Sequence, residues 1–213
     1  MLDELDRELE RRGHRFVRYA DDCNIYVRSE MAGRRVMQSL TRFIEGHLKL
    51  QINLEKSAVA RPWERSFLGF TFKNEPEFRR RIADKAVTRF KHRVRALTSR
   101  HRGVTLERMI RELASYLRGW AGYFGFSQSF ELQSLDSWVR RRIRCVVWVQ
   151  WKTCRRRYHE LRRLNVPERA ANEVVFSRKG PWRLSLTTAM HRAFSNARFR
   201  RLGLPTMGQL VKA

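Results

Sequence analysis

Charge divides this chain into two unequal parts, and the division constrains the fold more than any other feature. Residues 1–75 contain 14 basic and 12 acidic side chains, whereas residues 76–213 contain 32 basic and 9 acidic ones. The first part is close to neutral, and the second carries an excess of positive charge that is typical of proteins that bind polyanions. We therefore expect two units, of which the second binds nucleic acid. A basic surface that only maintains solubility is the alternative.

The composition favours a folded protein of one or two domains. Of the 213 residues 42% are hydrophobic, and six Trp and thirteen Phe are enough to build a core, which excludes a wholly disordered basic tail. No apolar run reaches the length of about 18 residues that a membrane span needs, and no signal peptide is present, so we expect a cytoplasmic protein. The cysteines Cys23, Cys145 and Cys154 lack the spacing of a disulfide framework or a zinc site.

Within residues 1–75 the pattern predicts the order strand, strand, helix, strand, strand. A short charged helical stretch at 3–12 comes first. Two runs at 14–28, rich in aromatic and β-branched residues, flank a pair of aspartates and predict a β-hairpin. Apolar residues then recur at helical spacing over 32–48, and short strands are expected at 57–60 and 67–72.

After residue 76 the periodicity is helical throughout. A basic amphipathic helix is expected over 82–97, and a second helix over 105–117. The sequence GWAGYFGF at 119–126 predicts a turn packed by its own rings. A long helix carrying ten cations, broken once, is expected over 132–164. A short helix and a last loop-plus-helix segment ending near residue 202 complete the prediction.

The sequence Tyr19-Ala20-Asp21-Asp22 is the strongest candidate for chemistry. Two adjacent carboxylates at a hairpin tip suit Mg²⁺, which takes oxygen ligands and completes its coordination with water and substrate phosphates. Two such ions can activate an attacking hydroxyl and neutralise a leaving pyrophosphate. Turn formation alone is the alternative reading of Asp21-Asp22, since aspartate is common in turns.

Several motifs resemble those of group II intron reverse transcriptases and maturases. FVRYADD followed by CNIYVRS resembles the palm hairpin of reverse transcriptases, and LKLQINLEKS and FLGFTF resemble the two motifs that follow it. LRGWAGYFGF, LDSWVRRRIRCVVWVQWK, GPWRLSLTTAM and FSNARFRRLGLP are similar to the thumb and maturase domain of the bacterial proteins. The resemblance covers nearly the whole chain and rests on several independent motifs.

The resemblance implies an α+β fold in three parts. A partial reverse-transcriptase palm of antiparallel strands and one helix would occupy 1–75, an all-α thumb 76–126, and a basic helical maturase domain 127–213.

The family's palm residues can be carried over to this sequence. Asp21 and Asp22 match the catalytic, metal-binding pair, and Tyr19 and Ala20 match the residues beside the primer terminus and the incoming nucleotide. The substrate-binding set also includes Asn53, Lys56 and Gly69. Turn formation by Asn53, a solvated lysine at Lys56 and an ordinary strand glycine at Gly69 are the alternatives.

We expect RNA to contact cations of the basic part, because guanidinium groups bind phosphates and rings stack on unpaired bases. The predicted RNA-binding residues are Arg89, Arg93, Arg140, Arg141, Arg144, Lys152, Arg155 and Arg156. Aromatic residues lie among them, and a place in the hydrophobic core is the stronger alternative for several of these rings. The rings among the cations are Tyr116, Trp120, Tyr123, Trp138, Trp148 and Trp151, and the core alternative applies to Trp120, Tyr123, Phe124 and Trp138.

The resemblance implies RNA-directed DNA synthesis, intron splicing and intron mobility, with Mg²⁺ as cofactor and intron RNA and target DNA as partners. The family also needs a further palm aspartate and a fingers domain before the YADD hairpin, and only 18 residues precede Tyr19. We therefore expect a C-terminal fragment that holds Mg²⁺ weakly and does not polymerise alone. A non-catalytic RNA-binding splicing factor, one half of a split enzyme completed by a separate fragment, and a gene remnant are the alternatives.

Overall fold

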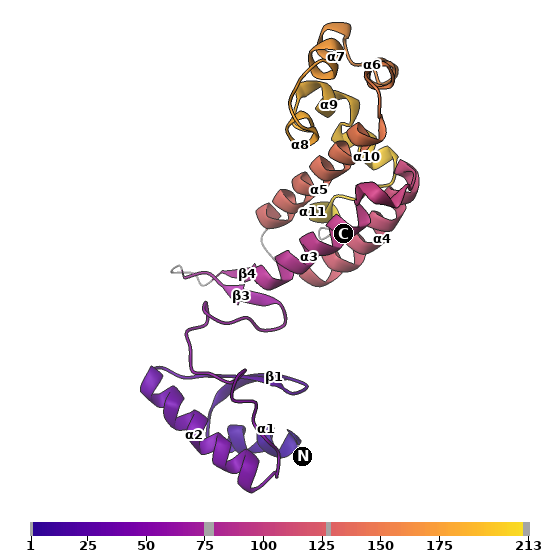
Figure 1. Ribbon diagram of the computed structural model, residues 1–213. Helices are drawn as coiled ribbons and strands as arrows, with labels where there is room; N and C mark the ends of the chain where they lie inside the picture. Colours follow the sequence, from indigo (N-terminus) through magenta and orange to yellow (C-terminus); the bar gives the residue numbers. More distant parts are fainter. Residues whose placement is uncertain (1, 75–78, 127–128, 211–213) are drawn as a thin grey trace. The chain divides into compact units, whose positions relative to one another are not determined.

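The computed structural model describes residues 2–74, 79–126 and 129–210 and groups the chain into two compact units. The first unit comprises Met1–Arg80 and contains most of the strands, and the second comprises Arg81–Ala213 and is built of helices (Figure 1). This arrangement confirms the predicted α+β class. The predicted boundaries at 75/76 and 126/127 adjoin residues outside the described ranges, and the division of the helical part into thumb and maturase domain stays a prediction.

The first unit is a β-hairpin packed on two helices. Helix α1 spans Leu2–Arg11, strands β1 and β2 span Arg15–Tyr19 and Asp22–Tyr26, and helix α2 spans Glu30–Gly46. The predicted hairpin and both predicted helices are confirmed, with ends shifted by one or two residues. Apolar side chains of all four elements form the core of this unit: Leu5, Leu9, Leu40 and Leu48, with Phe16, Cys23, Ile25, Val36, Phe43 and Ile44 packed against them.

The segment between α2 and the next strand differs from the prediction. No strand forms at 57–60, which the structure describes in full. The backbone turns before this segment, where Ser57 N donates to the Asn53 carbonyl at 2.9 Å. Val59 then packs against α2 at Gly33, where an added Cβ would lie 2.6 Å from Val59 Cγ1. Contact with a helix thus takes the place of pairing with a strand.

A second, smaller sheet forms farther along the chain. Of the predicted strand at 67–72, only β3 at Phe70–Phe72 is present, and it pairs with β4 at Arg80–Ile82, which the sequence pattern did not predict. Residues 75–78, between these strands, lie outside the described ranges.

The second unit is helical along its described length. Its elements are α3 (Asp84–Leu97), η1 (Arg100–Arg102), α4 (Leu106–Phe124), α5 (Ser129–Gln150), α6 (Cys154–Arg163), α7 (Glu168–Val175), α8 (Pro181–Leu184), α9 (Thr188–Ala193), α10 (Asn196–Arg201) and α11 (Met207–Leu210). Helix α5 lies in the middle, with α3, α4 and α11 near one end and α6 to α9 near the other (Figure 1). The predicted break in the long helix is confirmed, and Thr153 caps α6 by accepting a hydrogen bond from Arg156 N.

The predicted turn at 119–126 is wrong, because α4 continues to Phe124. The aromatic residues of this segment pack against other rings and do not end the helix. The Trp120 ring lies 4.5 Å from those of both Phe90 and Phe124, measured between centroids, and the Tyr116 ring lies 5.7 Å from that of Phe90. Phe90, from α3, is fully buried in this cluster. Aromatic packing between α3 and α4 therefore stabilises the helical conformation of α4 at Gly119 and Gly122.

A buried polar contact attaches α11 to α5. The Asp136 carboxylate accepts hydrogen bonds from Met207 N at 3.2 and 3.0 Å, and Arg140 Nη2 donates to Thr206 Oγ1 at 2.8 Å. Asp136 is only 3% exposed, and this burial raises the pKa of its carboxyl. The backbone donor compensates part of the cost of burying the charge.

Candidate functional site

The two candidate carboxylates lie at the tip of the β1–β2 hairpin. Tyr19 is paired with Asp22 in the strand register, so the connecting loop consists of Ala20 and Asp21. Ala20 adopts φ 53°, a left-handed conformation that costs a residue with a Cβ about 1 kcal/mol or more. Asp21, Asp22 and Tyr19 are all exposed. The hairpin thus presents both carboxylates to solvent on a backbone held in an unfavourable conformation.

Arg18 holds this turn from within the first unit. Its Nη1 donates to the Ala20 carbonyl at 2.8 Å, and its Nε donates to Asp6 Oδ1 at 2.7 Å. The hydrogen bond from Arg18 lowers the pKa of the Asp6 carboxyl. The Asp6 carboxylate is therefore engaged in fixing the turn.

The donor set fits Mg²⁺ in part. Magnesium is commonly held by one or two carboxylates together with waters and substrate phosphates, and Asp21 and Asp22 can supply those carboxylates. Within the described ranges, no three His, Cys, Asp or Glu side chains gather as a metal-ion site. Asp21 and Asp22 alone would therefore hold the ion loosely.

Asn53, Lys56 and Gly69 occupy turns in the first unit. Asn53 Oδ1 accepts a hydrogen bond from Lys56 N at 3.1 Å, so Asn53 acts as a turn former here. Gly69 adopts φ 80° between Phe67 and Phe70, which exchange backbone hydrogen bonds of 2.8 and 2.9 Å. It is thus a hairpin-turn glycine, and not the strand glycine of the alternative reading. Among the described residues, no hydrogen bond or ion pair joins these three to Asp21 or Asp22, and their substrate-binding role stays a prediction.

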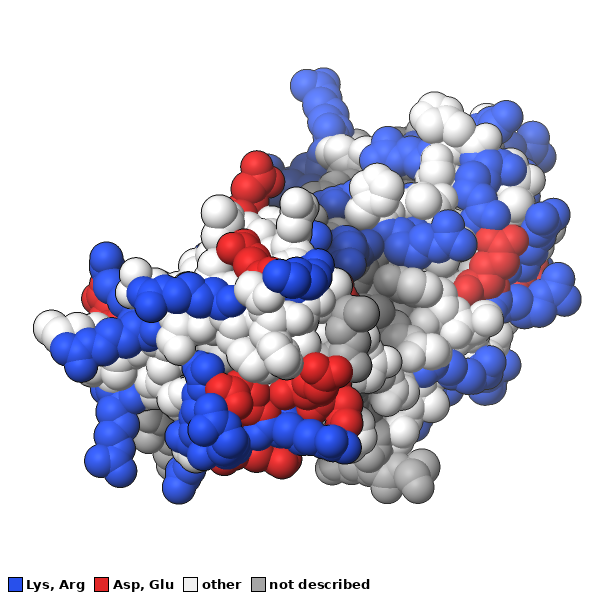
Figure 2. Space-filling model, turned by 90° about the horizontal axis from the view of Figure 1, so that it is seen from below, with Lys and Arg blue, Asp and Glu red and all other residues white. Residues whose placement is uncertain are grey.

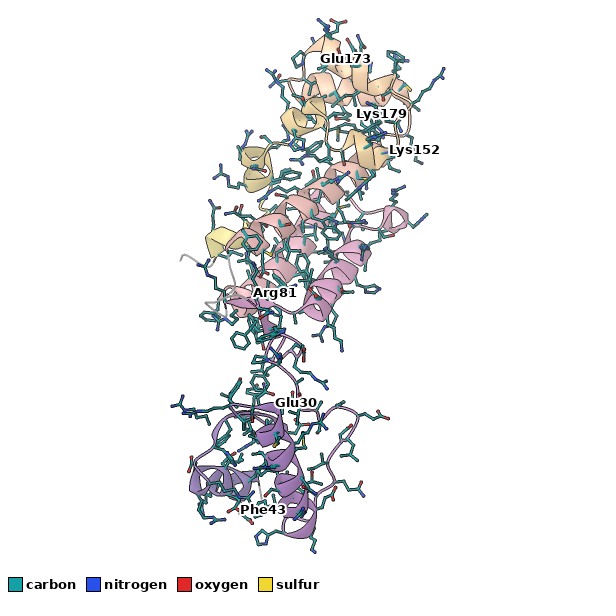
Figure 3. All side chains as sticks on the ribbon, turned by 90° about the vertical axis from the view of Figure 1, so that its left-hand side faces the viewer. Glu30, Phe43, Arg81, Lys152, Glu173 and Lys179 are labelled. Carbon is teal, nitrogen blue, oxygen red and sulfur yellow. The ribbon has the colours of Figure 1, made fainter. Side chains whose placement is uncertain are left out.

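Helix α6 presents most of its cations to solvent. Arg157, Tyr158, Leu161 and Leu164 follow the spacing of the inward side, and Arg155 and Arg156 are exposed on the other side, together with Lys152 just before the helix. Over the part of the chain that the structure describes, no acidic side chain forms an ion pair with any of these three. Figure 3 shows Lys152 at the same end of the second unit as Lys179.

Arg89 and Arg93 are exposed on α3, beside the stripe that contains the buried Ala86, Phe90 and Val94. Arg93 also lines an open pocket between α3 and α4 with Arg102, Glu112 and Tyr116. Both cations are therefore accessible to a polyanion, and their role as RNA contacts stays a prediction.

Arg140 and Arg144 lie elsewhere than predicted. They are 7% and 4% exposed on the stripe of α5 that also contains Asp136, so they belong to the core. Arg144 donates to the Phe194 carbonyl from Nε at 3.1 Å and from Nη2 at 2.9 Å, and burial lowers its pKa to about 10. Their burial contradicts the prediction that Arg140 and Arg144 contact RNA.

The aromatic residues are divided between core and surface. Trp148 and Trp151 are 2% and 7% exposed, which leaves no face for a nucleic acid base. The half-buried Trp138 lies beneath the guanidinium groups of Arg95 and Arg142, at 5.6 and 5.7 Å from the ring centroid. Of the rings named from the sequence, Tyr123 is the most exposed, at 51%.

The sequence pattern did not identify Trp182, a surface aromatic residue that contacts the predicted RNA-binding residue Arg141. The Arg141 guanidinium carbon lies 3.8 Å from the ring centroid of Trp182 in α8, and Arg141 Nη2 donates to the Trp182 carbonyl at 3.1 Å. Trp182 is 38% exposed. The signal in the sequence was a tryptophan between basic residues, Lys179 and Arg183, at the start of the predicted loop-plus-helix segment.

Basic side chains cover much of the visible surface. Figure 2 shows Lys and Arg over one face of the molecule, with Asp and Glu gathered in a few groups among them. None of the helices in residues 2–74, 79–126 and 129–210 combines the length and apolar character needed to cross a bilayer.

Comparison with protein families gives one match in each unit. Residues 1–72 match the family described as reverse transcriptase (RNA-dependent DNA polymerase). Residues 87–164 match the family described as group II intron, maturase-specific domain, and this match spans parts of both predicted helical domains. A comparison with curated proteins gave no match.

Proposed function

Because the chain belongs to the group II intron reverse transcriptase/maturase family, we propose that its second unit binds intron RNA through exposed cations of α3, α6 and the segments beside them. The maturase-specific match implies intron RNA as the partner. The proposed contacts are the exposed Arg89, Arg93, Lys152, Arg155 and Arg156, together with the half-buried Arg141 of α5. Binding of this kind serves the family's role in intron splicing and mobility.

The cations at the start of α6 support this proposal most directly. Lys152, Arg155 and Arg156 lie at the end of the helix that carries the positive pole of its dipole, where added positive charge is destabilising. The first turn of α6 contains no acidic residue to compensate. A bound anion would offset the repulsion among these exposed positive charges at the start of α6, and RNA phosphates can supply that anion.

The salt dependence of RNA binding tests the proposal. If six to ten cations meet phosphates, the affinity of the chain for RNA should fall by about 10³- to 10⁵-fold between 50 and 200 mM salt, because binding releases counterions. The affinity can be measured by filter binding with a labelled intron RNA. A flat salt response, or no binding at low salt, would overturn the proposed function.

We also propose that Asp21 and Asp22 hold Mg²⁺ in the company of nucleotide phosphates. The exposed pair and the rigid turn behind it support this role, since both oxygen donors face the solvent where a substrate would arrive. Bound there, the ion would supply electrostatic stabilisation to phosphoryl transfer. Tyr19 is exposed beside the pair and would contact the same substrate.

A primer-extension assay of the 213-residue polypeptide should give no DNA product on an RNA template with Mg²⁺. Two carboxylates on one hairpin leave most of the coordination of two ions to water. The assay is repeated with Asp21→Asn and with an added fingers and palm fragment of the same family. Extension by the chain alone that Asp21→Asn abolishes would contradict this expectation, whereas extension only with the added fragment would favour the split-enzyme reading.

A further inference from the structure

We propose that Trp182, supported by Arg141 and accompanied by Phe176, forms a stacking site for unpaired bases of single-stranded RNA. This inference rests on the proposed RNA-binding function and assigns part of it to the segment from Phe176 to Leu186. That segment lies beyond the maturase-specific match, which ends at residue 164.

The Trp182 ring is held firmly although it is partly exposed. Leu184 is only 2% exposed and Ser185 is fully buried, and these two residues anchor α8. The Arg141 guanidinium lies at stacking distance, 3.8 Å from the ring centroid, and so covers one face of the indole. Trp182 is nevertheless 38% exposed, so part of the residue outside the contact with Arg141 remains accessible. A ring that is fixed in place and partly accessible is ready to accept a base with little loss of entropy.

A second exposed ring lies six positions earlier in the chain. Phe176 follows α7 and is 74% exposed, which is costly for an aromatic side chain in water. The two residues can be at most about 20 Å apart, since an extended chain covers about 3.3–3.6 Å per residue. A short stretch of single-stranded RNA can therefore reach both rings.

The charges around the rings favour a polyanion over an apolar protein partner. Three exposed cations lie close to the two rings in the sequence: Arg178 and Lys179 between them, and Arg183 directly after Trp182. Residues 174–213 contain eight basic and no acidic side chains. Phosphates can therefore bind between the stacking positions without repulsion from a carboxylate in this part of the sequence. Base stacking requires unpaired bases, which selects single strands over duplexes.

The test measures the affinity of the full chain for a short single-stranded RNA that contains 2-aminopurine, and for a duplex of the same sequence. Trp182→Ala should weaken single-strand binding about 10-fold or more, the effect typical of a lost stacking ring, and leave duplex binding within about twofold. Trp182→Phe should retain most of the affinity. Quenching of 2-aminopurine fluorescence on binding, lost in Trp182→Ala, reports stacking itself.

Leu186→Ala is the matched control, because Leu186 is 53% exposed in the same segment but has no aromatic face. It should leave both affinities unchanged. Phe176→Ala removes a ring that is 74% exposed, so it cannot disturb the packing, and it should also weaken single-strand binding selectively. It keeps the test decisive if Trp182→Ala fails to fold.

Three results would overturn the inference. One is single-strand affinity that neither aromatic substitution changes, the second is equal weakening by Leu186→Ala, and the third is equal loss of single-strand and duplex binding. In each case the unmodified chain would still bind RNA, and the proposed function would stand. Failure of the unmodified chain to bind any RNA would instead defeat both.

Discussion

Replacing Lys152, Arg155 and Arg156 together with alanine should weaken RNA binding about 100-fold at physiological salt. Each phosphate contact contributes about one unit to the slope of log affinity against log salt, so three lost contacts should reduce this slope by about two to three. The same substitutions should slightly stabilise α6, because they remove positive charge from the positive end of the helix dipole. Filter binding over a salt series and thermal unfolding together provide both measurements.

The matched control is a triple substitution in the first unit that removes the same number of positive charges. Arg7, Arg11 and Arg34 are exposed, and each forms an ion pair with an acidic residue one turn away on its own helix. Replacing these three with alanine should change the RNA affinity by less than about threefold. Equal weakening in the two triple variants would mean that net charge alone drives binding, and it would contradict the assignment of a specific surface to α6.

Phe90→Ala should destabilise the second unit by about 3–5 kcal/mol, the usual cost of truncating a fully buried phenylalanine. Phe90 is fully buried and its ring contacts those of Tyr116 and Trp120, so the substitution opens a cavity between α3 and α4. Urea unfolding followed by circular dichroism measures the loss. Because α3 also carries Arg89 and Arg93, RNA binding should weaken as well, through disorder of the helix.

Phe176→Ala provides the comparison for this stability measurement. Phe176 is 74% exposed, and its removal should change the free energy of unfolding by no more than about 0.5 kcal/mol. A loss below about 1 kcal/mol for Phe90→Ala would show that the aromatic cluster is not what joins α3 to α4.

The local pattern of the sequence predicted the parts of the fold that depend on neighbouring residues. The hairpin followed from alternation on both sides of Asp21-Asp22, and α2 and α3 followed from apolar residues at helical spacing. The end of α4 could not be predicted in this way, because Gly119 and Gly122 indicated a turn. Both glycines are exposed, where each costs the helix about 1 kcal/mol, and the opposite side packs against Phe90. Packing between these distant segments therefore keeps residues 119–124 helical.

The candidate sites show the same limit. The carboxylate pair could be located from sequence because its hairpin is local. The cations of α5 were treated as one run, although Asp136, Arg140 and Arg144 recur at intervals of four and share a buried stripe. Following helical position as well as charge would have separated them from exposed cations such as Arg155. The stacking of Arg141 on Trp182 joins residues 41 positions apart, and no local pattern predicts it.

The attachment of α11 to α5 also affects how the protein folds during synthesis. The Asp136 carboxylate is buried, and the backbone amide that binds it belongs to Met207, 71 positions later. A ribosome releases the chain from its N-terminus, so α5 emerges long before its partner. Until residue 207 follows, Asp136 must stay hydrated or leave its charge without a donor. The second unit can therefore complete its core only after residue 207 has been synthesised.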